Sequence, residues 1–298
     1  MAQRQALVWP PVYDEKNRRI KGFYPWIVRN KKVGPLLDSI REQSSHPEVT
    51  RVSIRAVIPM AVLVQMVNRN MGGIHIEAAF PISHIISGCW VAYVSYNKPQ
   101  RASNEGLRSI VSISRKRSDP MAREELERQT TQYKIMQIKE MNDETAEKFS
   151  VLFASMFDVY PVDINPSAIR EMPQGHIVMA AYEGEELTAV FMADRASFNL
   201  EYRTPLTFFD FVNVVSKKDG LLLVPLMARH VVEIANQDIN PIIYAEARAD
   251  VPGLQICCIR AGMQNCGTLA ASSLFKDKGD DQAAFRDTKV WFIPNFIS

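Results

Sequence analysis

Residues 206–235 read LTFFDFVNVVSKKDGLLLVPLMARHVVEIA. The first part, Leu206–Val215, is almost entirely apolar and rich in aromatic and β-branched residues, which is typical of a buried strand. The polar segment Ser216–Gly220 ends in a glycine and predicts a loop. Leu221–Ala235 is long and strongly apolar, as a buried helix is. The stretch therefore predicts a core strand that passes through a short loop directly into a helix.

Strand and helix patterns alternate on both sides of this stretch. Apolar periodicity, capping residues and turn glycines indicate where each element begins and ends. In chain order the elements are a strand at Tyr133–Ile138, helices at Glu144–Phe157 and Pro166–Met172, a hairpin of Ile177–Tyr182 and Leu187–Ala193, and, after residue 235, a strand at Ile242–Ala247, a helix at Val251–Ala261 and a strand at Lys289–Ile293. The second half of the chain is therefore expected to be an α/β fold.

The N-terminal part also alternates. It contains a strand at Val49–Ile58, a helix at Pro59–Met71 that stops at two glycines, and strands at Gly73–Phe80 and Trp90–Tyr96. This order predicts a smaller α/β unit. Its pattern shows no obvious catalytic group.

A polar segment separates the two parts. Arg101–Arg128 is rich in charged residues and contains the basic run Arg115–Arg117, and Met121–Gln129 predicts an exposed helix. The basic run is either a phosphate-binding or docking patch or a solvated linker, and the linker interpretation is favoured. We place the boundary near residue 125, so that residues 1–125 form an N-terminal α/β domain with linker and residues 126–298 form the second domain.

Composition excludes several classes of protein. Of 298 residues, 35 are Lys or Arg and 33 are Asp or Glu, and this balance argues against a nucleic-acid binder. The longest apolar runs, around Ile58–Val67 and Ile85–Val94, are shorter than the ~20 residues of a membrane-spanning helix. Met1–Pro11 has no signal-peptide pattern. We therefore expect a soluble, cytoplasmic protein that binds neither nucleic acid nor membrane.

Cysteine and histidine spacings predict no metal site and no disulfide framework. The four cysteines include the vicinal pair Cys257 and Cys258 but no CxxC pair, and the five histidines lack the HxH and HxxxH spacings. Reduced thiols are the expected state.

The element order of the second half, β-α-α-β-β-β-α-β-α-β, resembles that of the GNAT superfamily of N-acetyltransferases. Three regions are similar to β-lysine N-acetyltransferases in particular. Residues 157–166 (FDVYPVDINP) resemble their Tyr-Pro-x-x-Ile-x-x-Pro segment, and residues 70–81 (NMGGIHIEAAFP) resemble their Gly-aromatic-x-x-Glu-Ala-x-Ile-Pro segment. Residues 244–249 (YAEARA), followed by 260–263 and 267–269, are similar to their closing Ala-Arg-Ala, Gly-Tyr and Gly-x-Leu elements.

The resemblance implies a fold and an activity. The implied fold is α/β (α+β): a C-terminal GNAT domain, whose mixed sheet is splayed between Leu206–Val215 and Ile242–Ala247, preceded by the smaller α/β domain. The implied activity is acyl transfer from acetyl-CoA or another acyl-CoA to the amine of an amino acid or similar small metabolite. Two alternatives stay open: an acyltransferase or synthase fed by an acyl carrier protein in a specialised biosynthetic pathway, and a non-catalytic protein that binds a ligand or partner. A homodimer is also kept open.

A GNAT enzyme holds the coenzyme pyrophosphate on an Arg/Gln-x-x-Gly-x-Gly/Ala loop at the start of a helix, where backbone N–H groups and the helix dipole favour anions. The matching positions here are residues 217–222. Gly220 is kept, but Leu222 stands where a small residue belongs and Asp219 adds a like charge. A solvated turn before a helix is the competing interpretation. The coenzyme-binding residues implied are Val214, Val215, Lys217, Lys218, Gly220, Leu221 and Leu222.

Acyl transfer needs a base for the amine and an acid for the leaving thiolate. Asp210 is the favoured base because burial among phenylalanines raises a carboxyl pKa, although a structural aspartate is an equal alternative; Glu201 and Glu246 are runners-up. GNAT enzymes place a tyrosine acid four residues before the glycine that ends the last helix. Cys258 occupies that position here, and a core cysteine is the competing interpretation. Tyr244 is a second candidate acid.

Two arginines follow predicted strands. Arg248 matches the arginine of the Ala-Arg-Ala element, and Arg195 follows the hairpin. Either guanidinium could bind the carboxylate of an amino-acid acceptor. Glu246 is also expected to be a substrate-binding residue. A structural ion pair is the competing interpretation for both arginines.

Overall fold

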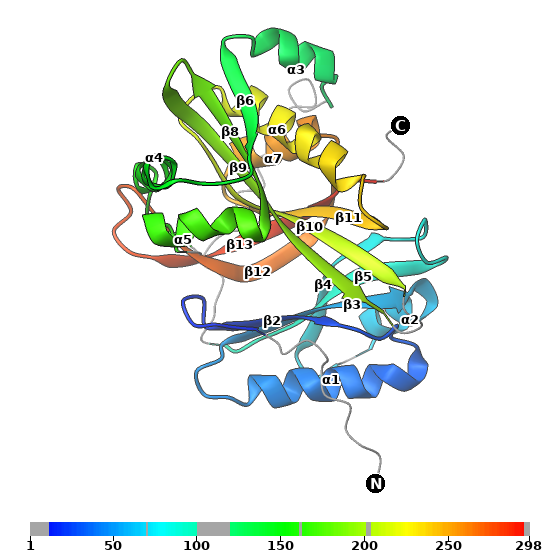
Figure 1. Cartoon of the computed structure of the whole chain (residues 1–298). Coiled ribbons are helices and arrows are strands. Elements are labelled where there is room, and N and C mark those ends of the chain that lie inside the picture. Colours follow the sequence, from blue (N-terminus) through cyan, green and yellow to red (C-terminus); the bar gives the residue numbers. More distant parts are fainter. Residues whose placement is uncertain (1–11, 70, 100–119, 161–162, 201–203, 295–298) are drawn as a thin grey trace.

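A computed structural model describes residues 12–69, 71–99, 120–160, 163–200 and 204–294 (Figure 1). Its strands form one large mixed sheet in the order β1-β2-β3-β5-β4-β12-β13-β11-β10-β9-β8-β6, with β7 beside β12. The strands are β1 (Val12–Asp14), β2 (Arg19–Tyr24), β3 (Arg51–Pro59), β4 (Ile74–Pro81), β5 (Cys89–Asn97), β6 (Tyr133–Ile138), β7 (Phe157–Val159), β8 (His176–Glu183), β9 (Glu186–Asn199), β10 (Pro205–Ser216), β11 (Pro241–Arg248), β12 (Gln264–Asp277) and β13 (Ala284–Phe292).

In the N-terminal half, α1 (Asn30–Ser44) covers one face of the sheet (Figure 1). Leu36 and Ile40 of α1 are buried in the same apolar cluster as Val52 and Ile54 of β3. The predicted strand at residues 49–58 is confirmed as β3. The helix predicted at Pro59–Met71 is shorter in the structure: α2 spans Met60–Val67 and ends before the glycine pair.

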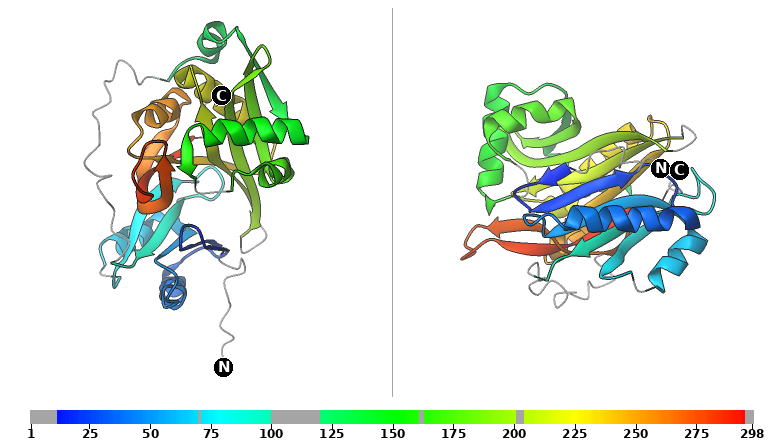
Figure 2. Two further views of the ribbon diagram at one scale, coloured as in Figure 1. Left: turned by 90° about the vertical axis from the view of Figure 1, so that its left-hand side faces the viewer. Right: turned by 90° about the horizontal axis from the view of Figure 1, so that it is seen from below.

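In the C-terminal half every predicted element is present in the predicted order, and β7 and β12 are additional strands that the sequence analysis did not predict. Its helices are α3 (Arg123–Gln129), α4 (Asp143–Ala154), α5 (Pro166–Glu171), α6 (Gly220–Ala235) and α7 (Pro252–Arg260), with a 3₁₀ turn at Met172–Gln174. Alternate residues of β8 pack on opposite faces of the sheet: Ile177 and Met179 belong to the cluster under α6 and α7, and Val178 and Ala180 to the cluster under α4 and α5. The sheet is therefore covered by helices on both faces (Figure 2).

The parallel pair at the centre of this half opens along its length. β10 and β11 pair from Thr207↔Pro241 to Phe211↔Ala245. Beyond Phe211, β10 continues to pair only with β9, across a bulge at Asn213, whereas β11 continues with β13. The predicted adjacency of these two strands is confirmed, and they separate after Phe211 and Ala245.

The two halves share a sheet and a core. β12 meets β4 at the register pair Gly267↔Ala78. Phe80 of β4 stacks on Phe292 of β13 with ring centroids 5.4 Å apart. The predicted division at residue 125 stays a prediction, and the basic run 115–117 lies outside the described residues.

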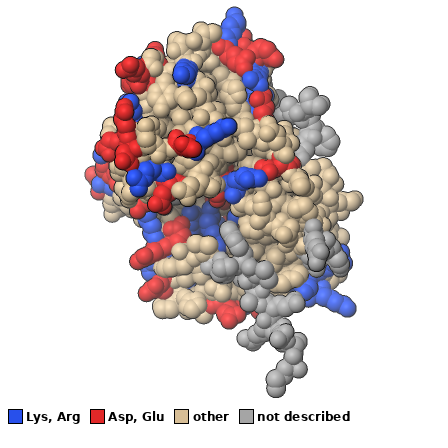
Figure 3. Space-filling model, viewed as in Figure 1, with Lys and Arg blue, Asp and Glu red and all other residues tan. Residues whose placement is uncertain are grey.

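Charged side chains are interspersed on the surface. Figure 3 shows Lys and Arg next to Asp and Glu over the upper and left-hand parts of the visible face, and a wide area without charged residues on the right. Among the described residues, no helix combines the length and apolar character needed to cross a bilayer.

Candidate active site

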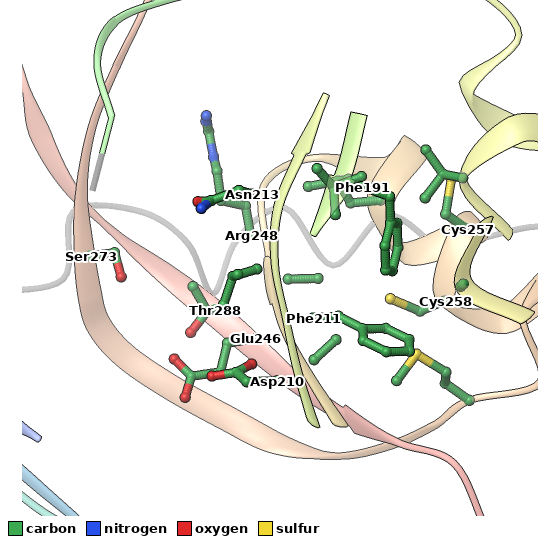
Figure 4. Close-up of a pocket in the computed structure, with 18 of the residues that line it drawn as sticks. Phe191, Asp210, Phe211, Asn213, Glu246, Arg248, Cys257, Cys258, Ser273 and Thr288 are labelled. Carbon is green, nitrogen blue, oxygen red and sulfur yellow. The ribbon is translucent and has the colours of Figure 1, made fainter. Parts of the chain in front are cut away.

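A cavity of about 170 Å³ lies where β10 and β11 separate (Figure 4). Its walls come from both halves of the chain. Besides β10 and β11, the elements that contribute side chains include β2, β12, β13, α6 and α7. Because the two central strands have parted, the cavity has one side under α6 and α7 and another side facing β2.

The side under α6 and α7 is apolar. Phe191, Phe211 and Met263 line it together with Cys257 and Cys258 (Figure 4). Burial raises the pKa of both thiols, that of Cys257 to about 12. The Cys257 Sγ donates a hydrogen bond to the Gly220 carbonyl at 3.3 Å. At neutral pH both cysteines are therefore thiols, and the raised pKa makes Cys258 a weaker acid as well as a poor nucleophile.

The opposite side is polar and holds two carboxylates. Asp210 of β10 is in register with Tyr244 of β11, and Glu246 follows two residues later, so Asp210 and Glu246 share a face of the sheet. Burial, and next to it the charge of Glu246, raises the pKa of Asp210 to about 7. Burial opposes ionisation of Glu246 too and is the largest single cause, but the charges of Lys21, Arg19 and Arg55 together outweigh it and lower the pKa of Glu246 to about 2. The two carboxyls therefore differ in protonation at neutral pH.

The cations around these carboxylates come from the N-terminal half. The Lys21 Nζ lies 3.0 Å from the Glu246 Oε2. Arg19 is bound to Asp14 at 2.9 Å and donates to the Ser273 hydroxyl at 2.8 Å. The sequence reasoning missed both cations, although their spacing of two residues on one strand was a usable signal. Nothing in their local sequence indicates a partner more than two hundred residues away.

Tyr244 is fully buried and is not among the residues that line the cavity. Its hydroxyl accepts a hydrogen bond from Arg55 and lies next to Asp210, and burial raises its pKa well above 10. Tyr244 therefore contacts Asp210 on the same face of the sheet without lining the cavity. Of the runners-up for the base, Glu246 lines the cavity, and Glu201 lies outside the described residues.

Both candidate arginines are bound to carboxylates of this chain. Arg248 lines the cavity, but its guanidinium contacts Asp250 at 2.8 Å and Asp277 at 2.6 Å. Arg195 is bound to Asp238 at 2.5 Å, is 51% exposed and does not line the cavity. These contacts match the ion-pair interpretation that the sequence left open.

The loop at the start of α6 lies next to the cavity, and its charges are paired. Lys217 contacts Glu186 at 3.3 Å, and Lys218 contacts Glu183. Asp219 has a left-handed backbone, with φ of +53°, and accepts a hydrogen bond from the Tyr133 hydroxyl at 2.5 Å. Both lysines are exposed, so an anion could displace the glutamates at small cost.

The remaining predicted coenzyme residues are divided between surface and core. Val214 lines the cavity, and Val215 is buried in the cluster under α4 and α5. Leu221 is exposed, and Leu222 is half-buried. Gly220 is tightly placed, because a Cβ there would lie 3.2 Å from the Ser216 Cβ. In the described part of the chain, no three His, Cys, Asp or Glu side chains are grouped as metal ligands would be.

No protein-family model matches this sequence, and no curated protein is similar to it in sequence. Solved structures show a partial likeness. NAA60 from Arabidopsis thaliana in complex with acetyl-CoA is 13% identical, with 54% of this chain and 97% of that chain covered and a TM-score of 0.42. An N-acetyltransferase from Staphylococcus aureus Mu50 is 15% identical, with 54% and 96% covered and a TM-score of 0.41. The ribosomal-protein-S18-alanine N-acetyltransferase from Escherichia coli is 9% identical, with 54% and 93% covered and a TM-score of 0.38.

Proposed function

We propose that this chain is an N-acyltransferase that moves an acyl group from coenzyme A to the amine of an amino acid or similar small metabolite. One observation carries the proposal: the cavity at the separation of β10 and β11 has an apolar side next to Cys258 and a polar side with Asp210. This is the place where the GNAT resemblance puts the thioester and the base. The narrower resemblance to β-lysine N-acetyltransferases stays a prediction, as do a cytoplasmic location and a homodimer.

Where β10 and β11 separate, backbone N–H and C=O groups can also form hydrogen bonds with a coenzyme. The edge of β10 that faces β11 has no strand partner beyond Phe211, since the register between them ends there. An extended ligand that carries amide groups can pair with such an edge as an added strand would. The pantetheine arm of coenzyme A has two amides, and Val214 belongs to the stretch of β10 that follows the last pair with β11. The arm would then lie between β10 and β11 and bring its sulfur to the cavity.

Asp210 suits the role of base. A carboxyl with a pKa of about 7 is partly ionised at neutral pH and can take a proton from the ammonium form of the acceptor. The neutral nitrogen then attacks the thioester carbon, a C–N bond forms and the C–S bond breaks. The nitrogen passes its second proton to the leaving coenzyme thiolate, through water or through the Cys258 thiol, which gives up one proton and takes up the other. Asp210 keeps one proton until it is released to solvent.

An acyltransferase fed by an acyl carrier protein is the second candidate, and the loop at the start of α6 favours it. The two lysines of the loop are bound to Glu183 and Glu186, and Asp219 adds a third carboxylate. These charges oppose a pyrophosphate. A carrier protein presents the same pantetheine arm on a single phosphate and so requires less positive charge from the loop. The non-catalytic alternative stays a prediction of the sequence.

We expect the double variant Lys217→Ala, Lys218→Ala to bind acetyl-CoA about 10-fold more weakly, because each exposed lysine contributes a screened contact of about 1 kcal/mol or less. The salt dependence of binding should also decrease. The matched variant Glu183→Gln, Glu186→Gln frees both lysines and should bind acetyl-CoA more tightly. Isothermal calorimetry at two salt concentrations measures both effects. Affinities that neither pair of substitutions changes would show that the loop does not hold the pyrophosphate.

We expect Cys258→Ser to lower kcat by less than about 10-fold, because water can protonate a thiolate leaving group whose pKa is ~8.5. Steady-state kinetics measure this. Mass spectrometry of the intact protein after incubation with acyl donor tests the direct-transfer route. An acyl adduct on Cys258 that the amine discharges would contradict direct transfer and assign a covalent step to this thiol.

A further inference from the structure

The polar side of the cavity contains three oxygen atoms without a hydrogen-bond partner among the described residues. They are the Asp210 Oδ1, the Glu246 Oε1 and the Thr288 Oγ1, and all three residues line the cavity. Thr288 is only 2% exposed, and the Glu246 side chain is 10% exposed. A buried acceptor without a donor is costly, so such atoms indicate a missing ligand. A ligand that suits this side of the cavity must supply several hydrogen-bond donors.

The cations that line the cavity are all bound to carboxylates of the chain itself. Lys21 is bound to Glu246, Arg19 to Asp14, and Arg248 to Asp250 and Asp277. A carboxylate on the acceptor would therefore meet the charges of Asp210 and Glu246, while every cation that lines the cavity is already paired with a carboxylate. Arg55, whose guanidinium donates to the Tyr244 hydroxyl, does not line the cavity. Like charges placed together cost several kcal/mol in a binding site.

We propose that the acceptor subsite takes a small primary amine or diamine that has no carboxylate, with its ammonium group bound by Asp210, Glu246 and Thr288. An ammonium carries three N–H donors and no acceptor, which matches the three unpartnered oxygens. The inference rests on the proposed acyl transfer and narrows its substrate class. It excludes free amino acids as good acceptors, contrary to the carboxylate-binding role expected for the two arginines.

Lys21 has a positioning role in this subsite. It holds the Glu246 Oε2 at 3.0 Å and leaves the Glu246 Oε1 unpartnered. Because β2 supplies Lys21 and Arg19, the N-terminal half forms one wall of the subsite. The acceptor would therefore bind between the two halves of the chain, with its ammonium on the same face of the sheet as Asp210.

Three amines with the same terminal aminobutyl group test the proposal: lysine, lysine methyl ester and 1,5-diaminopentane. We expect calorimetry without acyl donor to show the diamine bound at least about 10-fold more tightly than lysine, with the methyl ester closer to the diamine, since a like charge is removed in both. Lysine bound as tightly as the diamine, or no binding of any of the three, would overturn the proposal.

Turnover of the same amines with acetyl-CoA is a separate readout. If the binding order holds but no amine is acylated, the proposed function fails and the subsite stands. If lysine is bound and acylated best, the proposed function stands and this inference fails. The two failures are therefore distinguishable.

Substitutions of the subsite residues test whether the tighter binding of the diamine than of lysine arises there. Thr288→Val removes one acceptor and should weaken diamine binding several-fold, and Glu246→Gln should reduce the discrimination against lysine to within about threefold. If Glu246→Gln does not fold because Lys21 loses its partner, the double variant Lys21→Met, Glu246→Gln leaves no unpaired charge and should show the same loss.

Glu144→Gln, on the exposed face of α4, is the control and should bind all three amines as the wild type does. If every cavity variant still binds the diamine more tightly than lysine, the amine binds outside this subsite and the proposal is wrong.

Discussion

Replacing Asp210 with Asn is expected to lower turnover by about 10²–10⁴, the range that loss of a general base usually costs. Asn has nearly the same shape but cannot take a proton from the acceptor ammonium. The deficit should shrink towards high pH, where the acceptor amine is already neutral. In the wild type, kcat/KM should rise with pH and level off near the Asp210 pKa of about 7. Steady-state kinetics of both proteins across this range measure the effect.

Stability measurements separate a catalytic Asp210 from a structural one. The folded-state pKa of Asp210 lies above its ordinary value of 3.8, so the stability it contributes is present below about pH 4 and is lost as pH rises through about 7. Asn removes the buried charge, so the variant should be at least as stable as the wild type at pH 8. A variant that is inactive and also strongly destabilised at pH 8 would make Asp210 a structural residue.

Replacing Gly267 with Ala is expected to destabilise the protein by about 3–5 kcal/mol, because overpacking and backbone strain each cost roughly 1–3 kcal/mol. Gly267 has φ of +149°, and it is the residue at which β12 meets β4. A Cβ there would lie 2.5 Å from the Ala78 Cα and 2.6 Å from its Cβ, and closer still to the Glu77 carbonyl oxygen. Backbone atoms cannot rotate away, so the strands must separate. Urea denaturation followed by circular dichroism measures the loss.

The matched control is Gly34→Ala on α1, where a Cβ has no atom within 4 Å. Alanine has a higher helix propensity than glycine, so this variant should be up to about 1 kcal/mol more stable. Equal stabilities for the two alanine variants would mean that the β4–β12 junction does not hold the two halves together. A Gly267→Ala protein that unfolds in two steps would show that the halves can fold separately.

Local patterns gave most of the C-terminal elements. The strand, loop and helix of residues 206–235 were predicted to within a residue or two of β10 and α6, because a long apolar run and a polar loop with Gly220 are local signals. Helix α1 was missed. It has Gly34 and Pro35 in its first turns and no side-chain cap at its start, so its propensity is weak and packing against β3 stabilises it.

Strand β12 was missed for a different reason. Its sequence contains Gly267, paired alanines and the pair Ser272 and Ser273, and its pairing with β13 shifts register twice. It therefore lacks the alternation that marks a strand in sequence. Its conformation is fixed by the neighbouring strands β13, β4 and β7, and β4 and β7 come from distant parts of the chain.

For the candidate site, local sequence patterns identified which groups are available, whereas their contacts depend on the three-dimensional fold. A charged residue in an apolar strand was enough to identify Asp210 as a candidate, and the Ala-Arg-Ala pattern identified Arg248, while Glu246 was only a runner-up for the base. Their partners could not be read locally, because Lys21 lies 225 positions from Glu246 in sequence and 3.0 Å from it in space. Protonation depends on burial and on the distance to neighbouring charges, and packing alone sets both. The fold therefore decided that Asp210 titrates near neutral pH, that Glu246 stays ionised and that the Arg248 guanidinium is already occupied.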